Sequence, residues 1–210
     1  MQHIKIYQQQ RLTHADVTLM VEGPVTAERL QELQLHKQLD AFRRPREQHE
    51  ALVEIAALPE GRVIIARTDS AIIGYVTFHY PDELERWSEA NMDDLLELGA
   101  IEVASDYRSA GIGRALIQTG FQEGQLDDYI VYTTEYYWHW DLKGSQLSVW
   151  DYRKMMERLM KSVGMVWYAT DDPEICSHPA NCLMVRVGPN VPLSSEEAFD
   201  RIRFQRRRMY

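Results

Sequence analysis

The run Arg108-Ser-Ala-Gly111-Ile-Gly113 has the residue types and the spacing that suit the binding of a pyrophosphate group. A phosphate is bound well by several backbone N–H groups that converge without side chains in the way, and the N-terminus of a helix offers such groups together with the positive end of its dipole. Glycine at 111 and 113 lets the backbone approach closely, and the guanidinium of Arg108 can add a charge-assisted contact. The sequence therefore predicts an anion-binding loop made of Arg108, Ser109, Ala110, Gly111, Ile112, Gly113 and Arg114.

Other glycine-rich motifs do not fit this stretch. The Walker motif is excluded because the chain contains no Gly-Lys-Ser/Thr, and the dinucleotide fingerprint fails because Leu116 stands where its third glycine should be. The remaining alternative is a tight turn whose glycines only end a strand.

An anion-binding loop of this kind needs a strand before it and an amphipathic helix after it. The apolar run Leu98–Ala104 predicts the strand. Apolar and small residues at helical spacing predict a helix that starts at Gly111 and buries Ile112, Ala115, Leu116 and Thr119.

The rest of the chain predicts further strands and helices around this unit. Residues 62–66 and 71–78 read as a hairpin, and residues 81–96 as an inserted helical or irregular segment. The other predicted strands are 18–21, 129–134, 165–169 and 183–187, and the other predicted helices run from Thr26 past Leu39, over 48–57 and over 148–161. The order β-α-α-β-β-β-α-β-α-β-β indicates a mixed sheet packed on helices, in the α/β (α+β) class.

Composition and charge restrict the class of protein. With 210 residues, 45% hydrophobic and 26% charged, we expect one globular domain over 1–210, with an N-terminal strand-helix extension (about 1–60) and a basic C-terminal tail (about 195–210). The net charge of −9 argues against nucleic-acid binding. Residues 1–10 lack the apolar core of a signal peptide and no apolar run is long enough for a membrane helix, so we expect a cytoplasmic protein with no membrane partner. Seven acids lie within residues 82–97 and five arginines within residues 201–210, which favours a protein partner or contact between the two segments.

The two cysteines, Cys176 and Cys182, lie on either side of Pro179. Two free buried thiols are expected for a reducing compartment, although a disulfide is geometrically feasible. No metal site is predicted, because no second Cys/His pair with ligand spacing accompanies them.

Residues 101–116, Ile-Glu-Val-Ala-Ser-Asp-Tyr-Arg-Ser-Ala-Gly-Ile-Gly-Arg-Ala-Leu, resemble the acetyl-CoA signature of the GCN5-related N-acetyltransferases (GNAT). The likeness to that superfamily covers roughly residues 62–187. It implies a mixed, mostly antiparallel central sheet flanked by helices, with acetyl-CoA as co-substrate. It also implies that the backbone groups of Ile101 and Val103 pair with the pantetheine arm.

Four further segments, residues 42–52, 84–89, 133–144 and 177–183, look like the family of protein acetyltransferases linked to acetoin utilization in Bacillus-type bacteria. This closer resemblance runs over nearly the whole chain. It implies that the partner is acetyl-CoA synthetase, which such an enzyme switches off by acetylating an active-site lysine.

Two carboxylates, Glu97 and Glu102, are the candidates for a general base that deprotonates the acceptor amine. Glu97 lies eleven residues before Arg108, the offset of the base in histone-type members of the superfamily. Strand alternation predicts that Glu97, Gly99, Ile101 and Val103 share one face and that Glu102 points to the other. If the first face meets the cofactor, Glu97 is the better candidate. An acid that simply ends a solvated acidic segment is the alternative for Glu97.

The general acid is not assigned by the sequence. The superfamily usually has a tyrosine four residues before the glycine that opens the next strand, but here that position is Met160. Tyr136, Tyr137 and Tyr152 are alternatives. Solvent can also act as the acid, because the thiolate of a thiol with a pKa of about 8.5 is a tolerable leaving group.

Several features keep two interpretations open. The aromatic run from Tyr136 to Trp140 is either core or a substrate-facing wall, and His139 and His178 are more typical of hydrogen-bonded structural residues than of catalytic ones. Arg43, Arg44 and Arg46 could hold the 3′-phosphate of the nucleotide or an acidic partner. Two other functions also fit: a small-amine acetyltransferase of the polyamine type, and an acetyl-CoA-binding regulator without turnover.

Overall fold

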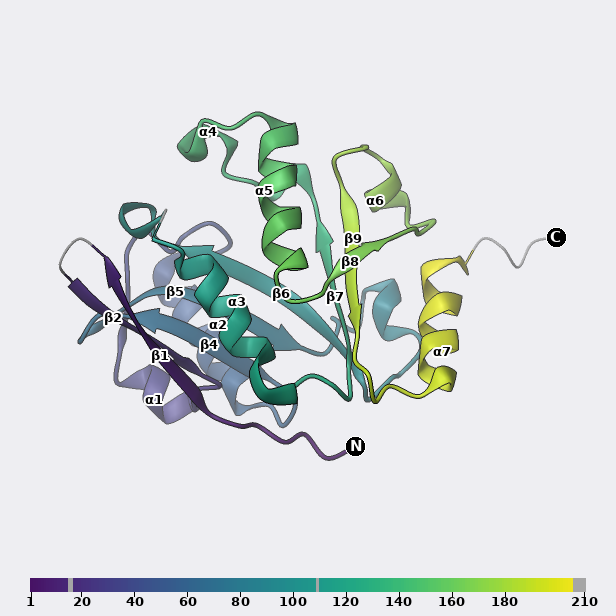
Figure 1. Cartoon of the computed structure of the whole chain (residues 1–210), viewed down its shortest axis with the longest axis horizontal. Helices are drawn as coiled ribbons and strands as arrows, with labels where there is room; N and C mark the ends of the chain where they lie inside the picture. The colour runs from purple at the N-terminus through teal and green to yellow at the C-terminus, as the bar shows by residue number, and fades with distance from the viewer. Residues whose placement is uncertain (15–16, 109, 206–210) are drawn as a thin grey trace. The chain divides into compact units, whose positions relative to one another are not determined.

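The computed structural model describes residues 1–14, 17–108 and 110–205, and these residues form two compact units (Figure 1). The N-terminal unit comprises residues 2–79 and 98–125. The C-terminal unit comprises residue 1, residues 80–97 and the described residues from 126 onward. Strand β6 (Leu95–Val103) begins in the C-terminal unit and ends in the N-terminal unit.

The N-terminal unit is built on a hairpin, as predicted. Strands β4 and β5 pair antiparallel from Arg62↔Phe78 to Arg67↔Ile72, β2 pairs antiparallel with both β1 and β4, and the short β3 runs parallel to β5. The strands are β1 (Gln8–His14), β2 (Val17–Gly23), β3 (Gln34–Leu35), β4 (Arg62–Arg67) and β5 (Ala71–His79).

Helices cover both faces of this part of the sheet (Figure 1). Val63 and Ile65 of β4 belong to a core shared with α1 and α2, whereas Ile64 lies on the other face near Gly120 of α3. Alternate residues of one strand thus contact different helices, which explains the uninterrupted apolar run of β4. The helical elements are α1 (Ala27–Gln31), α2 (Pro45–Ala57), η2 (Ser105–Tyr107), α3 (Ile112–Phe121) and η3 (Gln122–Gly124).

The C-terminal unit has its own core. Its strands are the start of β6, β7 (Ile130–Glu135), β8 (Val166–Tyr168) and β9 (Cys182–Val187), and its helical elements are η1 (Arg86–Ser88), η4 (Tyr137–His139), α4 (Leu142–Ser145), α5 (Val149–Lys161), α6 (Pro173–Cys176) and α7 (Leu193–Arg203). Strand β6 is parallel to β7, and β9 is antiparallel to both β7 and β8. The rings of Trp87, Tyr132 and Phe199 pack together, with centroid distances of 5.1 to 6.4 Å, and join η1, β7 and α7.

The predicted fold class is confirmed: the sheet is mixed and mostly antiparallel, and helices flank it. Two helices begin at side-chain caps: the Thr26 hydroxyl accepts a hydrogen bond from the N–H of Arg29 at 3.2 Å, and Ser148 caps α5. No helix among the described residues combines the length and the apolar composition needed to cross a membrane.

The predicted helix from Thr26 past Leu39 is wrong in length. It ends after Gln31, because the chain then pairs with β5: the N–H of Gln34 donates to Ser70 O at 3.2 Å and that of His36 to Ile72 O at 2.9 Å. Leu30, Leu33 and Leu39 are nevertheless buried, as their apolar spacing suggested, in the core beneath α2.

Two strands and one of the cysteines differ from the prediction. Strand β1 was not predicted because its sequence is polar, and β6 begins at Leu95 rather than Leu98. The segment before β6 is mostly irregular and contains the short η1, which agrees with the expectation of a helical or irregular segment. Cys176 is exposed and Cys182 is buried, and both thiols are free, so the expectation of two buried thiols is correct only for Cys182.

Candidate active site

The loop between β6 and α3 has the predicted strand–turn–helix context. Gly111 is the N-cap of α3 and has a left-handed backbone, with φ of 74°, which favours glycine. No side chain caps this helix, and its first internal hydrogen bond runs from the N–H of Ala115 to Gly111 O at 3.0 Å. The N–H groups of Ile112, Gly113 and Arg114 therefore precede the hydrogen bonds of the helix.

The space around the two glycines is open. A Cβ atom built on Gly111 or Gly113 would meet no described atom within 4 Å, whereas one on Gly120 of the same helix would lie 2.7 Å from the Phe78 ring. Packing thus explains the glycine at 120, and backbone conformation explains that at 111. Neither packing nor backbone conformation requires a glycine at 113. This favours a loop that admits a ligand over a tight turn whose glycines only end a strand.

The other residues of the predicted loop surround this helix end. The Nε of Arg108 donates to Val103 O at 3.2 Å, so its side chain folds back over the end of β6. Arg114 is exposed, Ile112 is buried, and Ala110 is partly exposed. Ser109 lies outside the described residues.

Burial agrees with the predicted alternation from Glu97 to Val103, except that Ala100, on the same face as Glu102, is partly exposed. Glu97, Gly99, Ile101 and Val103 are all at least partly exposed, whereas Leu96, Leu98 and Glu102 are buried. The cofactor contacts expected of Ile101 and Val103 stay predictions.

The carboxylate of Glu102 is engaged in structural hydrogen bonds. It accepts one from the Ala41 N–H at 2.9 Å and one from the Tyr75 hydroxyl at 2.7 Å. Burial, together with the charge of Glu102, raises the pKa of Tyr75 above its ordinary value. Glu102 thus ties the segment after β3 to β5.

The carboxyl group of Glu97 lies in a different environment. Although the residue is partly exposed, loss of hydration around the carboxyl group raises its pKa to about 8, and the negative charges of Glu85 and Asp82 act in the same direction. Glu97 is opposite Tyr132 in the parallel register of β6 and β7, and the Tyr132 hydroxyl lowers the pKa of Glu97 slightly. The hydroxyl is fully buried, and within the described part of the chain it makes no hydrogen bond of good geometry. The sequence did not indicate Tyr132 or Glu85, because they lie in other elements than Glu97 and come near it only in the folded chain.

The aromatic run from Tyr136 to Trp140 divides between core and surface. Trp140 is buried, stacks on Tyr152 at 5.2 Å and donates through Nε1 to Glu135 at 2.9 Å. Trp138 is exposed and stacks on Tyr136 at 4.8 Å. Met160, at the position where a tyrosine was expected, is completely buried.

The two histidines that the sequence singled out lie among these rings. His178 packs on Tyr137 at 4.2 Å, and its Nδ1 accepts the N–H of Ala180 at 3.1 Å, as expected for a structural histidine. His139 contacts the rings of Tyr136 and Trp138.

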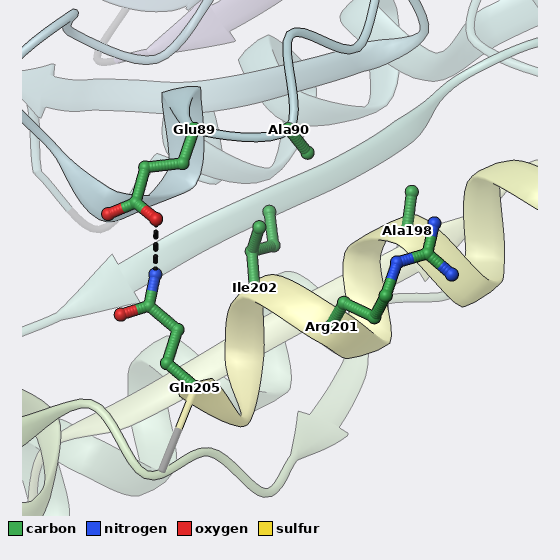
Figure 2. A pocket seen from close by; sticks show the side chains of 6 residues that line it. All are labelled: Glu89, Ala90, Ala198, Arg201, Ile202 and Gln205. Carbon is green, nitrogen blue, oxygen red and sulfur yellow. Dashed lines mark hydrogen bonds between the residues drawn. The ribbon is translucent and has the colours of Figure 1, made fainter. Parts of the chain in front are cut away.

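A pocket elsewhere in the C-terminal unit contains none of the predicted site residues (Figure 2). It lies between the end of η1 and α7, and Figure 2 shows the Gln205 amide donating to the Glu89 carboxylate, at 2.7 Å. Its lining residues are Glu89, Ala90, Ala198, Arg201, Ile202 and Gln205. The hydrogen bond between Gln205 and Glu89 connects the end of α7 to the acid-rich residues 82–97.

Comparison with known proteins gives consistent results. The model of the acetyltransferase (GNAT) family matches residues 29–136. Two proteins called acetoin utilization protein AcuA are similar over all 210 residues and over their own full length, at 59% identity for Bacillus subtilis (strain 168) and 55% for Bacillus licheniformis. The crystal structure of an acetoin utilization protein from Exiguobacterium sibiricum 255-15 is 54% identical, with a TM-score of 0.96 over 99% of this chain and 98% of that one.

Proposed function

The chain belongs to the GNAT family of acetyltransferases, and on that basis we propose that it transfers acetyl from acetyl-CoA to an active-site lysine of acetyl-CoA synthetase and thereby inactivates it. The family makes it an acetyl-CoA-dependent acetyltransferase. The name of its relatives supports a role in acetoin utilization. The resemblance in the sequence supports the synthetase as partner, and the lack of a long apolar run supports the cytoplasm as location.

The observation that carries the proposal is the open, uncapped N-terminus of α3. Gly111 and Gly113 leave room there for a pyrophosphate, which the N–H groups of Ile112, Gly113 and Arg114 would bind. Arg108 would add positive charge beside it, and backbone groups of Ile101 and Val103 would pair with the pantetheine arm. Bound acetyl-CoA supplies a thioester as acetyl donor.

Glu97 is the group best suited to take the proton of the acceptor. A lysine with a pKa of about 10.4 is neutral only about 0.04% of the time at pH 7. Deprotonating it therefore costs roughly 4.6 kcal/mol of free energy, which a base must offset. A carboxylate whose pKa is about 8 accepts a proton far more readily than an ordinary one. Glu102 is less suited because its oxygens already accept hydrogen bonds from Ala41 and Tyr75.

Protonation of the departing thiolate does not require a protein side chain in this proposal. Water can supply that proton, since a thiol pKa near about 8.5 makes the thiolate a tolerable leaving group. Tyr152 on α5, and Tyr136 and Tyr137 after β7, stay the candidate side chains for this role, and replacing each with Phe would reveal a contribution as a lower kcat at unchanged KM.

A labelling experiment separates this function from its alternatives. The protein is incubated with labelled acetyl-CoA and either purified acetyl-CoA synthetase or a panel of amines, and the label is located by mass spectrometry. Label on a synthetase lysine, with loss of synthetase activity, supports the proposal, and a synthetase with that lysine changed to Arg is the control. Label only on small amines contradicts it, and binding without transfer indicates a non-catalytic regulator.

A further inference from the structure

Five carboxylates lie near one another in the C-terminal unit, and we call them the acidic cluster: Asp82, Glu85, Glu97, Asp172 and Glu174. They come from the segment before η1, from β6 and from the start of α6. Their proximity is visible in their effects on one another. Loss of hydration is the largest cause of the raised pKa of Glu85, and the charges of Asp82, Glu174 and Asp172 raise it further. The pKa of Glu97 is likewise raised by loss of hydration and then by the charges of Glu85 and Asp82.

The backbone that carries the cluster is firmly held. Trp87, two residues after Glu85, packs on Tyr132 with ring centroids 5.1 Å apart and fixes the segment over β7. Arg86 donates to Asp171 at 2.8 Å and to the carbonyl of Ile202 at 2.6 Å. The carboxylates are thus held near one another by packing and are not simply mobile acids on a loop.

Among the residues that the structure describes, few ion pairs balance the charge of the cluster. Arg86 pairs with Asp172 at 3.4 Å as well as with Asp171. Glu85, Glu97 and Glu174 form no ion pair with any residue that the structure describes. Asp82, Glu85 and Glu174 are exposed and can be reached from solvent.

A second observation points to a ligand beside Glu97. The Tyr132 side chain is completely buried, and its hydroxyl makes no well-formed hydrogen bond within the described chain. Tyr132 stands next to Glu97 in the strand register, and its hydroxyl interacts electrostatically with Glu97 and Glu85, so it is directed into the cluster. A buried hydroxyl without a good partner is unfavourable, and a small movement of the Glu97 carboxylate on binding an amine would satisfy it.

We propose that the acidic cluster recognises a peptide segment that carries positive charge in addition to the reacting amine. Glu97, oriented by the Tyr132 hydroxyl, takes the reacting amine, and Asp82, Glu85 and Glu174 take the neighbouring cation. One ammonium balances only one of these charges, and the exposed acids come from two separate segments, which suits a basic stretch of chain. This inference rests on the proposed function, because it specifies the acceptor of that same reaction.

Two peptides and two variants test the recognition. The peptides contain one lysine flanked either by two arginines or by two citrullines, which have nearly the same shape and no charge. The wild type should prefer the arginine peptide by about tenfold in kcat/KM, mainly through KM, since exposed ion pairs contribute modestly. In D82N/E85Q the preference should fall to about twofold or less.

The matched control is E83Q. It removes an exposed carboxylate that lies in the same segment as Asp82 and Glu85 but does not belong to the acidic cluster. It should keep the wild-type preference. Equal rates for the two peptides with the wild type, or an undiminished preference in D82N/E85Q, would overturn the proposal.

Tyr132 acts in this proposal as a positioning residue. Y132F should lower kcat for both peptides with little change in KM, and it should move the apparent pKa of the rising limb of the kcat/KM profile upward, because the hydroxyl lowers the pKa of Glu97. A purely structural role would reduce activity without moving that limb, and this result would contradict the positioning role. Urea unfolding of the variant checks its stability.

Failure of the proposed function would give a different pattern. If only free amines are acetylated, the protein substrate is wrong, and the comparison becomes 1,5-diaminopentane against pentylamine. A preference for the diamine that D82N/E85Q removes supports recognition of a second cation, and equal rates overturn it. If no amine is acetylated, calorimetric titration measures the affinity for the two peptides instead. Tighter binding of the arginine peptide that D82N/E85Q removes supports the proposal, and equal affinities overturn it.

Discussion

The two glutamates of β6 differ in what surrounds their carboxyl groups, and this difference leads to opposite predictions. E97Q should lower kcat by about 10² to 10⁴, the usual contribution of a general base, with little loss of stability. For the wild type, kcat/KM should rise with pH through an apparent pKa near 8, since only the ionised carboxyl accepts a proton. A pH–rate profile from about pH 6 to 10 measures both effects.

E102Q provides the contrast on the same strand. It should retain most of the activity and lose stability, because it weakens the hydrogen bonds from Ala41 and Tyr75. A loss of rate in E102Q larger than that in E97Q would reverse the assignment of the base.

Glu135 is a buried acid that the proposed reaction does not use, and it should make stability depend on pH. Burial raises its pKa from 4.5 to about 7, despite the hydrogen bond from Trp140 and the positive charge of Arg153. The folded state therefore holds the proton more tightly than the unfolded state. The resulting stability is fully present below about pH 4.5 and is lost as pH rises through 7, on the order of 3 kcal/mol in all.

E135Q should remove this part of the pH dependence, since the amide that it introduces would still accept the Trp140 hydrogen bond without ionising. Urea unfolding at about pH 5.5 and 8.5 should show a smaller difference for E135Q than for the wild type. E157Q is the control: Lys161 lowers the pKa of Glu157, so its contribution is lost only as pH falls and changes little in this range. An identical pH dependence in E135Q and the wild type would contradict the prediction.

The start of α3 allows folding and ligand binding to be separated within one element. G113A should leave stability unchanged or raise it by up to about 1 kcal/mol, because its Cβ meets open space and alanine favours a helix. The same methyl group would stand where the pyrophosphate approaches, so acetyl-CoA affinity should fall by at least about tenfold. Thermal unfolding and calorimetric titration with acetyl-CoA measure the two effects.

G120A, on the same helix, should show the reverse. Its Cβ would lie 2.7 Å from the Phe78 ring, so it should destabilise the protein by about 1–3 kcal/mol while acetyl-CoA affinity is kept. Unchanged affinity in G113A would mean that this loop does not bind the pyrophosphate.

The elements that the sequence predicted well are those with local signals. The hairpin of β4 and β5, the capped helix α5 and the strand–loop–helix around Gly111 all carry their apolar pattern and their turn or cap residues within a few positions. Strand β1 has no such pattern, and its pairing with β2 stabilises it, together with the hydrogen bond from Gln10 to Thr119. The short α1 shows the opposite case, in which pairing with β5 replaces a helix that the apolar spacing favoured.

At the scale of the whole chain, the part of the candidate site that depends on distant residues was beyond sequence reasoning. Glu97 and Tyr132 are 35 positions apart and become neighbours only through the parallel pairing of β6 and β7. Asp82 and Glu174 similarly come together because Trp87 and Arg86 hold the acidic segment against β7 and α7. The motif near Arg108 could be predicted because all of its residues are consecutive.

The charge of the whole molecule gives the two substrates opposite dependences on salt. The chain has 32 acids against 23 lysines and arginines, a net charge of −9, so its field attracts a cationic acceptor and repels the anionic acetyl-CoA. Between about 20 and 300 mM NaCl, kcat/KM for an arginine-flanked lysine peptide should fall about tenfold, because the Debye length shortens to well below the size of the protein. Under the same change, kcat/KM for acetyl-CoA should stay constant or rise, and the citrulline peptide should change little. Parallel falls for all three substrates would indicate a general effect of salt on the enzyme and would contradict electrostatic attraction of the acceptor.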